Sequence, residues 1–136
     1  MISIDTNVLL RRLLRDDEAQ TARVDELFAR NSSILVTDIA LCEALWTLTG
    51  PRYRITRKYV EHVVVGLISD PQIVLEDTDA VWGAINDFVE HGKADFADAL
   101  IINKSRRIAE NLDEWGSADT YTFDKGALEI FGAYHP

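Results

Sequence analysis

The fold is decided by residues 1–14, which run MISIDTNVLLRRLL. Ile2 and Ile4 precede a polar residue, and this pattern predicts a short buried strand over residues 1–5. The remainder of the stretch predicts a helix over about Thr6–Leu14. A buried strand that leads directly into a helix begins a strand–helix–strand unit, so we expect an α/β protein.

The same alternation continues along the chain. Further strands are predicted at residues 34–36, 73–75 and 120–123 and near 130–133, helices at about 17–30, 38–49, 56–68, 77–91 and 95–112, and a long connection over 110–119. Short apolar strands that alternate with helices form a parallel sheet covered on both faces. In such sheets, ligand sites form beyond the carboxyl ends of the strands.

The composition is that of an ordinary globular domain. The 136 residues suit one core, with 47% hydrophobic and 27% charged residues. No apolar run approaches the roughly 20 residues that cross a bilayer, and the N-terminus has no signal-peptide pattern. The single cysteine, Cys42, excludes an internal disulfide framework and fits a reducing cytoplasm. We therefore expect one cytoplasmic domain over residues 1–136, without a membrane segment.

The net charge of −9 argues against a protein that coats nucleic acid through a broad basic face. Basic residues still cluster locally, although each cluster taken alone is typical of a solvated helix face. Arg11, Arg52, Arg54, Arg57 and Lys58 belong to these clusters and offer a surface that could position a substrate.

Two carboxylates interrupt helices that are otherwise apolar. Glu43 lies within Ile39–Trp46, which is apolar nearly all round and so predicts a buried helix; the alternative is a position that faces water. Asp98 lies in the apolar run 96–102 and shares the first helical turn with Asp95. A buried carboxylate is costly unless a cation or several hydrogen bonds receive it. The alternative, a favourable interaction with the helix dipole, explains Asp95 better than Asp98.

Two further carboxylates follow predicted strands. Asp5 ends the first strand and Asp124 follows the fourth, although as single residues both are equally explained as helix-cap or turn residues. If the four acids Asp5, Glu43, Asp98 and Asp124 share one pocket, they need positive charge to stay ionised at neutral pH. The side chains of Thr6, Asn7 and Thr122 could orient ligands or water around them.

A hard divalent cation would meet this need. Oxygen-only ligands favour Mg²⁺ or Mn²⁺ over Zn²⁺, and the three histidines, His62, His91 and His135, show no zinc-ligand spacing. Divalent ions held by carboxylates beside an open groove suit phosphodiester hydrolysis, because they activate water and stabilise the departing oxygen.

Four stretches together resemble the PIN-domain family, and most of all its VapC branch, the toxin halves of bacterial toxin–antitoxin pairs. They are Ile4–Arg11 (IDTNVLLR), Glu43 on its helix, Asp95–Ile101 (DFADALI) and Thr122–Asp124 (TFD). The resemblance covers essentially the whole chain, and the first and third stretches are the most specific.

The resemblance implies a PIN-like three-layer α/β/α fold with a short, mostly parallel sheet of about four or five strands. It implies an Mg²⁺- or Mn²⁺-dependent endoribonuclease with a catalytic, metal-binding quartet of Asp5, Glu43, Asp98 and Asp124. Asp95 matches an additional acid found in part of the family. Similar proteins commonly form homodimers, cleave structured RNA such as tRNA or rRNA, and are inhibited by a small cognate antitoxin. With RNA as the substrate, the resemblance implies that the basic residues named above, Arg11, Arg52, Arg54, Arg57 and Lys58, contact it.

Three alternatives remain at this stage. An acidic-pocket phosphatase of the haloacid-dehalogenase type wants a second aspartate two residues after its nucleophile, but Asp5 is followed by Thr6 and Asn7. A receiver domain wants a phosphoacceptor aspartate at the end of a central strand, and Val74–Asp77 is a poor candidate. A non-catalytic PIN-like module that binds RNA or protein is less consistent with an intact set of four acids.

Overall fold

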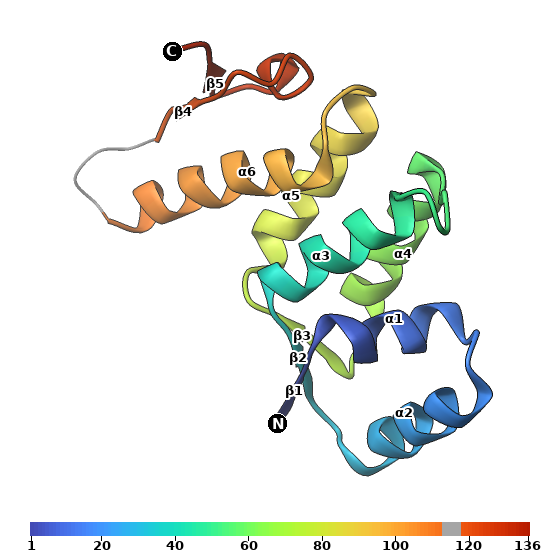
Figure 1. Cartoon of the computed structure of the whole chain (residues 1–136). Helices are drawn as coiled ribbons and strands as arrows, with labels where there is room; N and C mark the ends of the chain where they lie inside the picture. Colours follow the sequence, from blue (N-terminus) through green and yellow to red (C-terminus); the bar gives the residue numbers. More distant parts are fainter. Residues whose placement is uncertain (113–117) are drawn as a thin grey trace. The chain divides into compact units, whose positions relative to one another are not determined.

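The computed structural model describes residues 1–112 and 118–136, and the chain falls into two units, Met1–Glu76 (unit 1) and Asp77–Pro136 (unit 2). Figure 1 shows the helices and strands of both units, coloured along the chain. Of the connection predicted over residues 110–119, residues 113–117 lie outside the described part of the chain. The single domain expected from the sequence stays a prediction.

Unit 1 combines a small parallel sheet with four helices. In chain order its elements are β1 (Ile2–Ile4), α1 (Thr6–Leu14), α2 (Glu18–Arg30), β2 (Ile34–Val36), α3 (Asp38–Thr49), α4 (Arg57–Ser69) and β3 (Ile73–Leu75). The strands are parallel in the order β1-β2-β3, and Ile34 pairs with both Ile2 and Ile73. Each crossover between neighbouring strands is helical, as parallel pairing requires.

The helices of unit 1 begin where the sequence offers a capping side chain. The side chains of Asp5, Asp17, Thr37 and Thr56 each accept the backbone N–H three residues ahead, at the start of α1, α2, α3 and α4. Such caps satisfy amide groups that have no partner within the helix, and each typically stabilises the fold by about 1 kcal/mol.

The core of unit 1 is aliphatic, and its fully buried side chains include Leu9, Ile34, Val36, Leu41, Leu48 and Val64.

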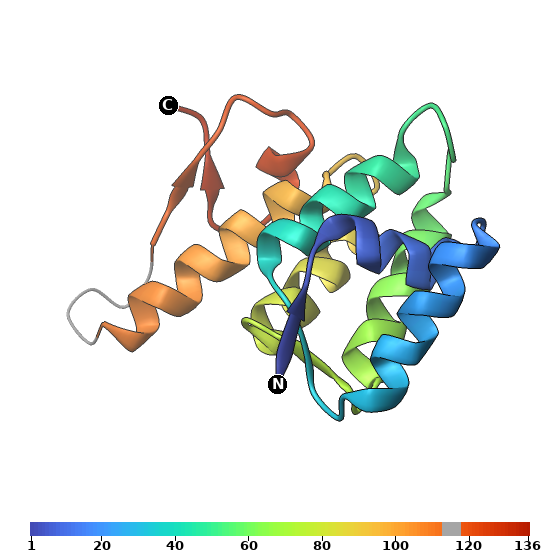
Figure 2. The same ribbon diagram turned by 60° about the horizontal axis from the view of Figure 1, so that its bottom comes forward.

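Unit 2 is built from two long helices and a small parallel ladder. Its elements are α5 (Thr78–Glu90), α6 (Phe96–Asn111), β4 (Thr120–Tyr121), the 3-10 turn η1 (Ala127–Glu129) and β5 (Ala133–Tyr134). Strands β4 and β5 pair in parallel and lie alongside α6 (Figure 2). The fourth strand is therefore shorter than the predicted 120–123, because Thr122 already begins the turn that leads to Asp124.

Helices α5 and α6 pack closely through a polar contact. The buried amide of Asn103 on α6 donates to Oδ2 of Asp87 on α5 at 2.7 Å and to the carbonyl of Ala99 at 2.9 Å. A Cβ at Gly83 would collide with the Asn103 side chain, so the glycine makes room for this contact. At the other end of the pair, Arg107 Nε donates to both carboxylate oxygens of Asp77, at 2.8 and 2.9 Å.

The predicted α/β class is confirmed. The five strands that lie within residues 1–112 and 118–136 occur in parallel pairs, three in one sheet and two in another, and helices separate the strands of the first sheet. In the described part of the chain, no helix combines the length and the apolar character that a membrane crossing needs.

Candidate active site

Asp5 lies at the carboxyl edge of the unit 1 sheet, directly after β1. Its Oδ1 accepts the N–H of Val8 at 2.9 Å, so the capping role that the sequence allowed is present. On the neighbouring strand β2, Val36 pairs with Ile4, which places Thr37 beside Asp5 at the same edge. One oxygen of Asp5 is thereby used to hold α1, and the exposed carboxylate keeps a second oxygen for a ligand.

Glu43 is joined to the start of α1. The hydroxyl of Thr6 donates a hydrogen bond of 2.6 Å to Oε2 of Glu43, across 37 residues of sequence. Since Thr6 directly follows Asp5, this bond brings the α3 carboxylate to the segment that carries the first acid. Thr6 therefore contacts one of the candidate acids, and Asn7, the next residue of α1, is exposed.

The prediction that Glu43 lies in a helix buried nearly all round is wrong. Glu43 is exposed, and its helix also exposes Ile39 and Trp46, which keep 73% and 77% of their surface. These three residues fall at helical positions i, i+4 and i+7 and form one outward stripe. The inward face of α3 is fully supplied by Ala40, Leu41, Ala44, Leu45 and Leu48.

Three acids gather in unit 2. Asp95 caps α6, accepting the N–H of Phe96 at 2.7 Å, and Asp98 lies half-buried in the first turn of that helix. Burial raises the pKa of Asp98, and the nearby carboxylates of Asp124 and Asp95 raise it further. As expected from the sequence, Asp98 is a carboxylate among apolar residues and other carboxylates, and its ionised form is disfavoured.

Asp124 is held by its own turn. Its Oδ1 accepts the N–H of Ala127 at 2.8 Å, and its N–H donates to Oγ1 of Thr122 at 3.0 Å. Two residues on, a Cβ at Gly126 would collide with the carbonyl of Lys93, in the connection between α5 and α6. This close approach of two backbone segments fixes the Asp124 turn against the segment that leads into Asp95 and Asp98.

The five acids therefore form two groups, one in each unit. Unit 1 holds Asp5 and Glu43, linked through Thr6, and unit 2 holds Asp95, Asp98 and Asp124, linked electrostatically. All donors are carboxylate oxygens, which suit a hard divalent cation. The raised pKa of Asp98 fits the same conclusion, because a cation would favour the ionised form that burial and its neighbours disfavour.

The predicted RNA-contacting residues lie in unit 1, and some are committed to other side chains. Arg11 binds Asp16 at 2.6 Å and donates to Gln20. Arg54 has a left-handed backbone (φ 50°), and its Nε donates to the carbonyl of Pro51. The remaining three lie nearby: the guanidinium of Arg52 stands over the ring of Tyr53, and Arg57 and Lys58 form the exposed first turn of α4.

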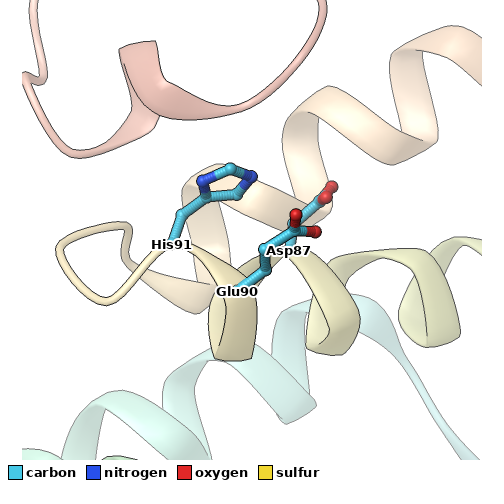
Figure 3. A group of neighbouring side chains, drawn as sticks. All are labelled: Asp87, Glu90 and His91. Carbon is cyan, nitrogen blue, oxygen red and sulfur yellow. The ribbon is translucent and has the colours of Figure 1, made fainter.

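One further group of potential ligands was not predicted. On the last turn of α5 and its C-cap, ligand atoms of Asp87, Glu90 and His91 all lie within 4.8 Å of one another (Figure 3). Asp87 already accepts from Asn103, and the Arg106 guanidinium lies 3.8 Å away. These donors satisfy Asp87 and a guanidinium repels a cation, so Asp87 is explained by the contact between α5 and α6 and not by a metal ion.

Sequence reasoning also missed three charged residues near the acids. Glu76 follows β3, and its carboxylate accepts the N–H of Asp38 at the start of α3. Lys93 and Lys125 are both exposed; the first lies in the segment that Gly126 contacts, and the second follows Asp124. Glu76 was predictable as a residue at a strand end, but the placement of the lysines depends on the turn at Gly126.

Comparison with known proteins gives one match. A model of the PIN domain family matches residues 2–121. No curated protein and no solved structure matches the chain. The matched range contains Asp5, Glu43, Asp95 and Asp98, whereas Asp124 lies just beyond its end.

Proposed function

Because the chain belongs to the PIN domain family, we propose that it is an endoribonuclease that hydrolyses RNA phosphodiester bonds with the help of Mg²⁺ or Mn²⁺. PIN domains are generally metal-dependent nucleases, which supports hydrolysis as the class of reaction. In this proposal Asp5, Glu43, Asp98 and Asp124 are the catalytic, metal-binding acids, with Asp95 as an additional ligand.

The observation that carries the proposal is the environment of Asp98. A half-buried carboxylate with a raised pKa, beside Asp95 and Asp124, costs stability in a protein without a cation. Carboxylates with strongly shifted pKa values are commonly found at functional sites. When bound, a divalent ion would activate water and stabilise the departing oxygen.

The other polar residues have supporting roles in this proposal. Thr6 holds Glu43 by its hydrogen bond, and Thr122 holds the backbone of Asp124. Both act by fixing where a carboxylate points, as residues around a metal site commonly do. Asn7 directly follows Thr6 in α1, is exposed and is available to a ligand or a water molecule.

In this proposal the RNA backbone is contacted by the basic residues between Arg52 and Lys58 and by Arg11. Arg57 and Lys58 occupy the first turn of α4, which contains no acidic residue. The helix dipole disfavours cations at this end, so the two charges do not stabilise α4. They do produce a local positive potential in a chain whose net charge is −9, which suits binding of phosphate.

Cleavage of a labelled structured RNA tests the proposal. The purified chain should cut it in Mg²⁺ or Mn²⁺, stop in EDTA and recover when the metal is restored. Asp98→Asn should abolish cleavage, and Glu90→Gln, outside the proposed acids, should not. Metal-dependent hydrolysis of a phosphomonoester without cleavage of RNA would contradict the nuclease and favour an acidic-pocket phosphatase. RNA binding without hydrolysis in either metal would leave only a binding module.

We also propose that the protein is a VapC-type toxin that acts in the cytoplasm as a homodimer and is neutralised by a small antitoxin. Unit 1 offers a place for apolar side chains of a partner, a hollow of about 370 Å³ whose lining includes Leu13, Leu48 and Val63. Induced expression should arrest growth, and the arrest should require Asp98. Unimpaired growth with active enzyme present would overturn the toxin role without affecting the nuclease proposal. Sedimentation of the purified chain tests the dimer.

A further inference from the structure

The segment around Asp124 exposes an unusual number of aromatic rings. Tyr121, Phe123 and Tyr134 keep 65%, 76% and 46% of their surface, and His135 is also exposed. We refer to these four residues as the aromatic surface. Proteins rarely expose several large rings together unless the rings bind something.

The four rings form two pairs across the β4–β5 ladder. Tyr121 pairs with Tyr134 in register, with ring centroids 6.2 Å apart and planes inclined by 42°. Phe123 and His135 meet edge to face, at 5.3 Å and 90°. Such pairs are favourable by about 0.5–1.5 kcal/mol each, so they favour these ring orientations before a ligand binds.

The aromatic surface is continuous with the acids of unit 2. Phe123 directly precedes Asp124, and the turn that follows Asp124 approaches the backbone of Lys93 closely at Gly126, two residues before Asp95. Thr122, between the two exposed rings, donates its N–H to the carbonyl of Tyr134 at 2.9 Å and accepts the N–H of Asp124 with its hydroxyl. One hydrogen-bonded segment therefore positions both the rings and the carboxylate.

The chemistry of the surface matches nucleobases. Its rings include two phenols and an imidazole, with the exposed side chain of Lys125 beside Asp124. Aromatic rings are also enriched in protein interfaces, but here they adjoin Asp124, one of the acids proposed to act on RNA. Stacking on aromatic rings binds unpaired bases without requiring a basic surface, an advantage in a chain of net charge −9. Bases inside a duplex are already stacked and cannot use it.

We propose that Tyr121, Phe123, Tyr134 and His135 stack unpaired nucleobases next to the phosphate that is cut. The substrate is then a single strand or a loop, and the duplex part of a structured RNA is not cleaved. This inference rests on the proposed nuclease function, because it uses Asp124 as part of the site.

Binding and cleavage are measured separately to test it. Binding of a short labelled single-stranded RNA, and of the same sequence as a duplex, is followed by fluorescence anisotropy in an Asp98→Asn background. Phe123→Ala should weaken single-strand binding by about 5- to 150-fold, the range for loss of one base–aromatic stack, and should leave the weaker duplex binding unchanged. Phe123→Trp should restore single-strand binding, which a purely structural role would not predict.

The matched control is Phe131→Ala. Phe131 lies in the same unit and is 79% exposed, but its ring faces Arg106 and, unlike Phe123, it does not neighbour Asp124 in the sequence, so its loss should not affect RNA binding. Wild-type cleavage with unchanged single-strand binding in Phe123→Ala and Tyr121→Ala would overturn the stacking surface and leave the nuclease intact. If the same variants instead changed only the sedimentation coefficient, the surface would be a protein interface. Absence of any RNA cleavage by the wild type, with single-strand binding still dependent on Phe123, would contradict the nuclease alone.

Discussion

The hydroxyl of Thr6 donates a 2.6 Å hydrogen bond to Oε2 of Glu43, and this bond joins the first turn of α1 to the middle of α3. Both side chains lie near the surface, where water competes for the bond, so its contribution to folding is modest. Its importance is that it holds an exposed carboxylate in one position. Positioning of this kind affects metal binding and activity more than it affects stability.

Replacement of Thr6 by valine, which keeps the shape and removes the hydroxyl, should lower kcat/KM for RNA by about 10- to 100-fold. Thr6→Ser keeps the donor and should retain most of the activity. The free energy of unfolding of Thr6→Val should change by no more than about 1 kcal/mol. Steady-state cleavage and urea unfolding of the three proteins provide the measurement; equal activity in valine and serine variants would remove Thr6 from the site.

Asp98→Asn should have opposite effects on activity and stability. Loss of a metal ligand should reduce cleavage by more than about 100-fold, since even residues that only orient ligands account for about 10- to 100-fold. The raised pKa of Asp98 means that its ionised form is less favourable in the folded than in the unfolded chain. Near neutral pH and in EDTA, the variant should therefore unfold at a higher urea concentration than the wild type. A lower midpoint would contradict the electrostatic cost assigned to this carboxylate.

Divalent metal should stabilise the wild type against thermal unfolding. A ligand present at 100 times its Kd adds about 2.7 kcal/mol to the free energy of unfolding. The rise in Tm with Mn²⁺ should be lost in Asp98→Asn and kept in Glu90→Gln, because Asp87 is already engaged by Asn103 and Arg106. The reverse pattern would place the ion at Asp87, Glu90 and His91.

Acid should loosen unit 2 at the start of α5. Burial disfavours the ionised form of Asp77, but the N–H of Ala80 and the guanidinium of Arg107 outweigh it and lower the pKa of Asp77 below its ordinary 3.8. A lowered folded-state pKa contributes stability that is present above about pH 3.8 and is lost as the pH falls through the folded value. Asp77→Ala should cost about 0.5–2 kcal/mol at neutral pH through loss of the cap alone.

The dependence on pH separates this contribution from others. Urea unfolding measured from pH 6 down to pH 2 should show a smaller loss of stability for Asp77→Ala than for the wild type, because the variant has no carboxylate to protonate. Asp79, which is 77% exposed and lies 3.3 Å from Arg107, supplies the control: Asp79→Ala should leave the acid sensitivity unchanged. Parallel curves for wild type and Asp77→Ala would contradict the assignment.

The elements that the sequence predicted well are those with local causes. Helix starts follow from single side chains, and Asp17, Thr56 and Asp77 cap the helices where the pattern of polar and apolar residues indicated. Strands of three apolar residues between turn residues were also predictable, since Ile34–Val36 and Ile73–Leu75 occur with the expected bounds. Both signals are contained in a few neighbouring residues.

What failed depended on distant parts of the chain. The apolar residues around Glu43 suggested burial, but composition alone cannot tell which side of a helix is covered, and Trp46 faces outward. The pairing of Phe123 with His135 depends on β5 returning beside β4, which no local pattern encodes. Asp98 could be recognised because the apolar residues that make a carboxylate unfavourable there are its neighbours in the sequence. Its interaction with Asp124 could not, because Asp124 lies in a separate turn.

Gly126 carries no charge and offers no side chain to a substrate, yet its backbone approaches the carbonyl of Lys93 so closely that no other residue fits without a shift. In a saturation-mutagenesis screen for activity, this position should therefore be as intolerant as an aspartate of the site. A reader of such a screen would be inclined to assign it a chemical role. Gly126 acts by setting the distance between the Asp124 turn and the segment that leads into α6. Any side chain at this position would increase that distance and so displace Asp124, without taking part in the reaction itself.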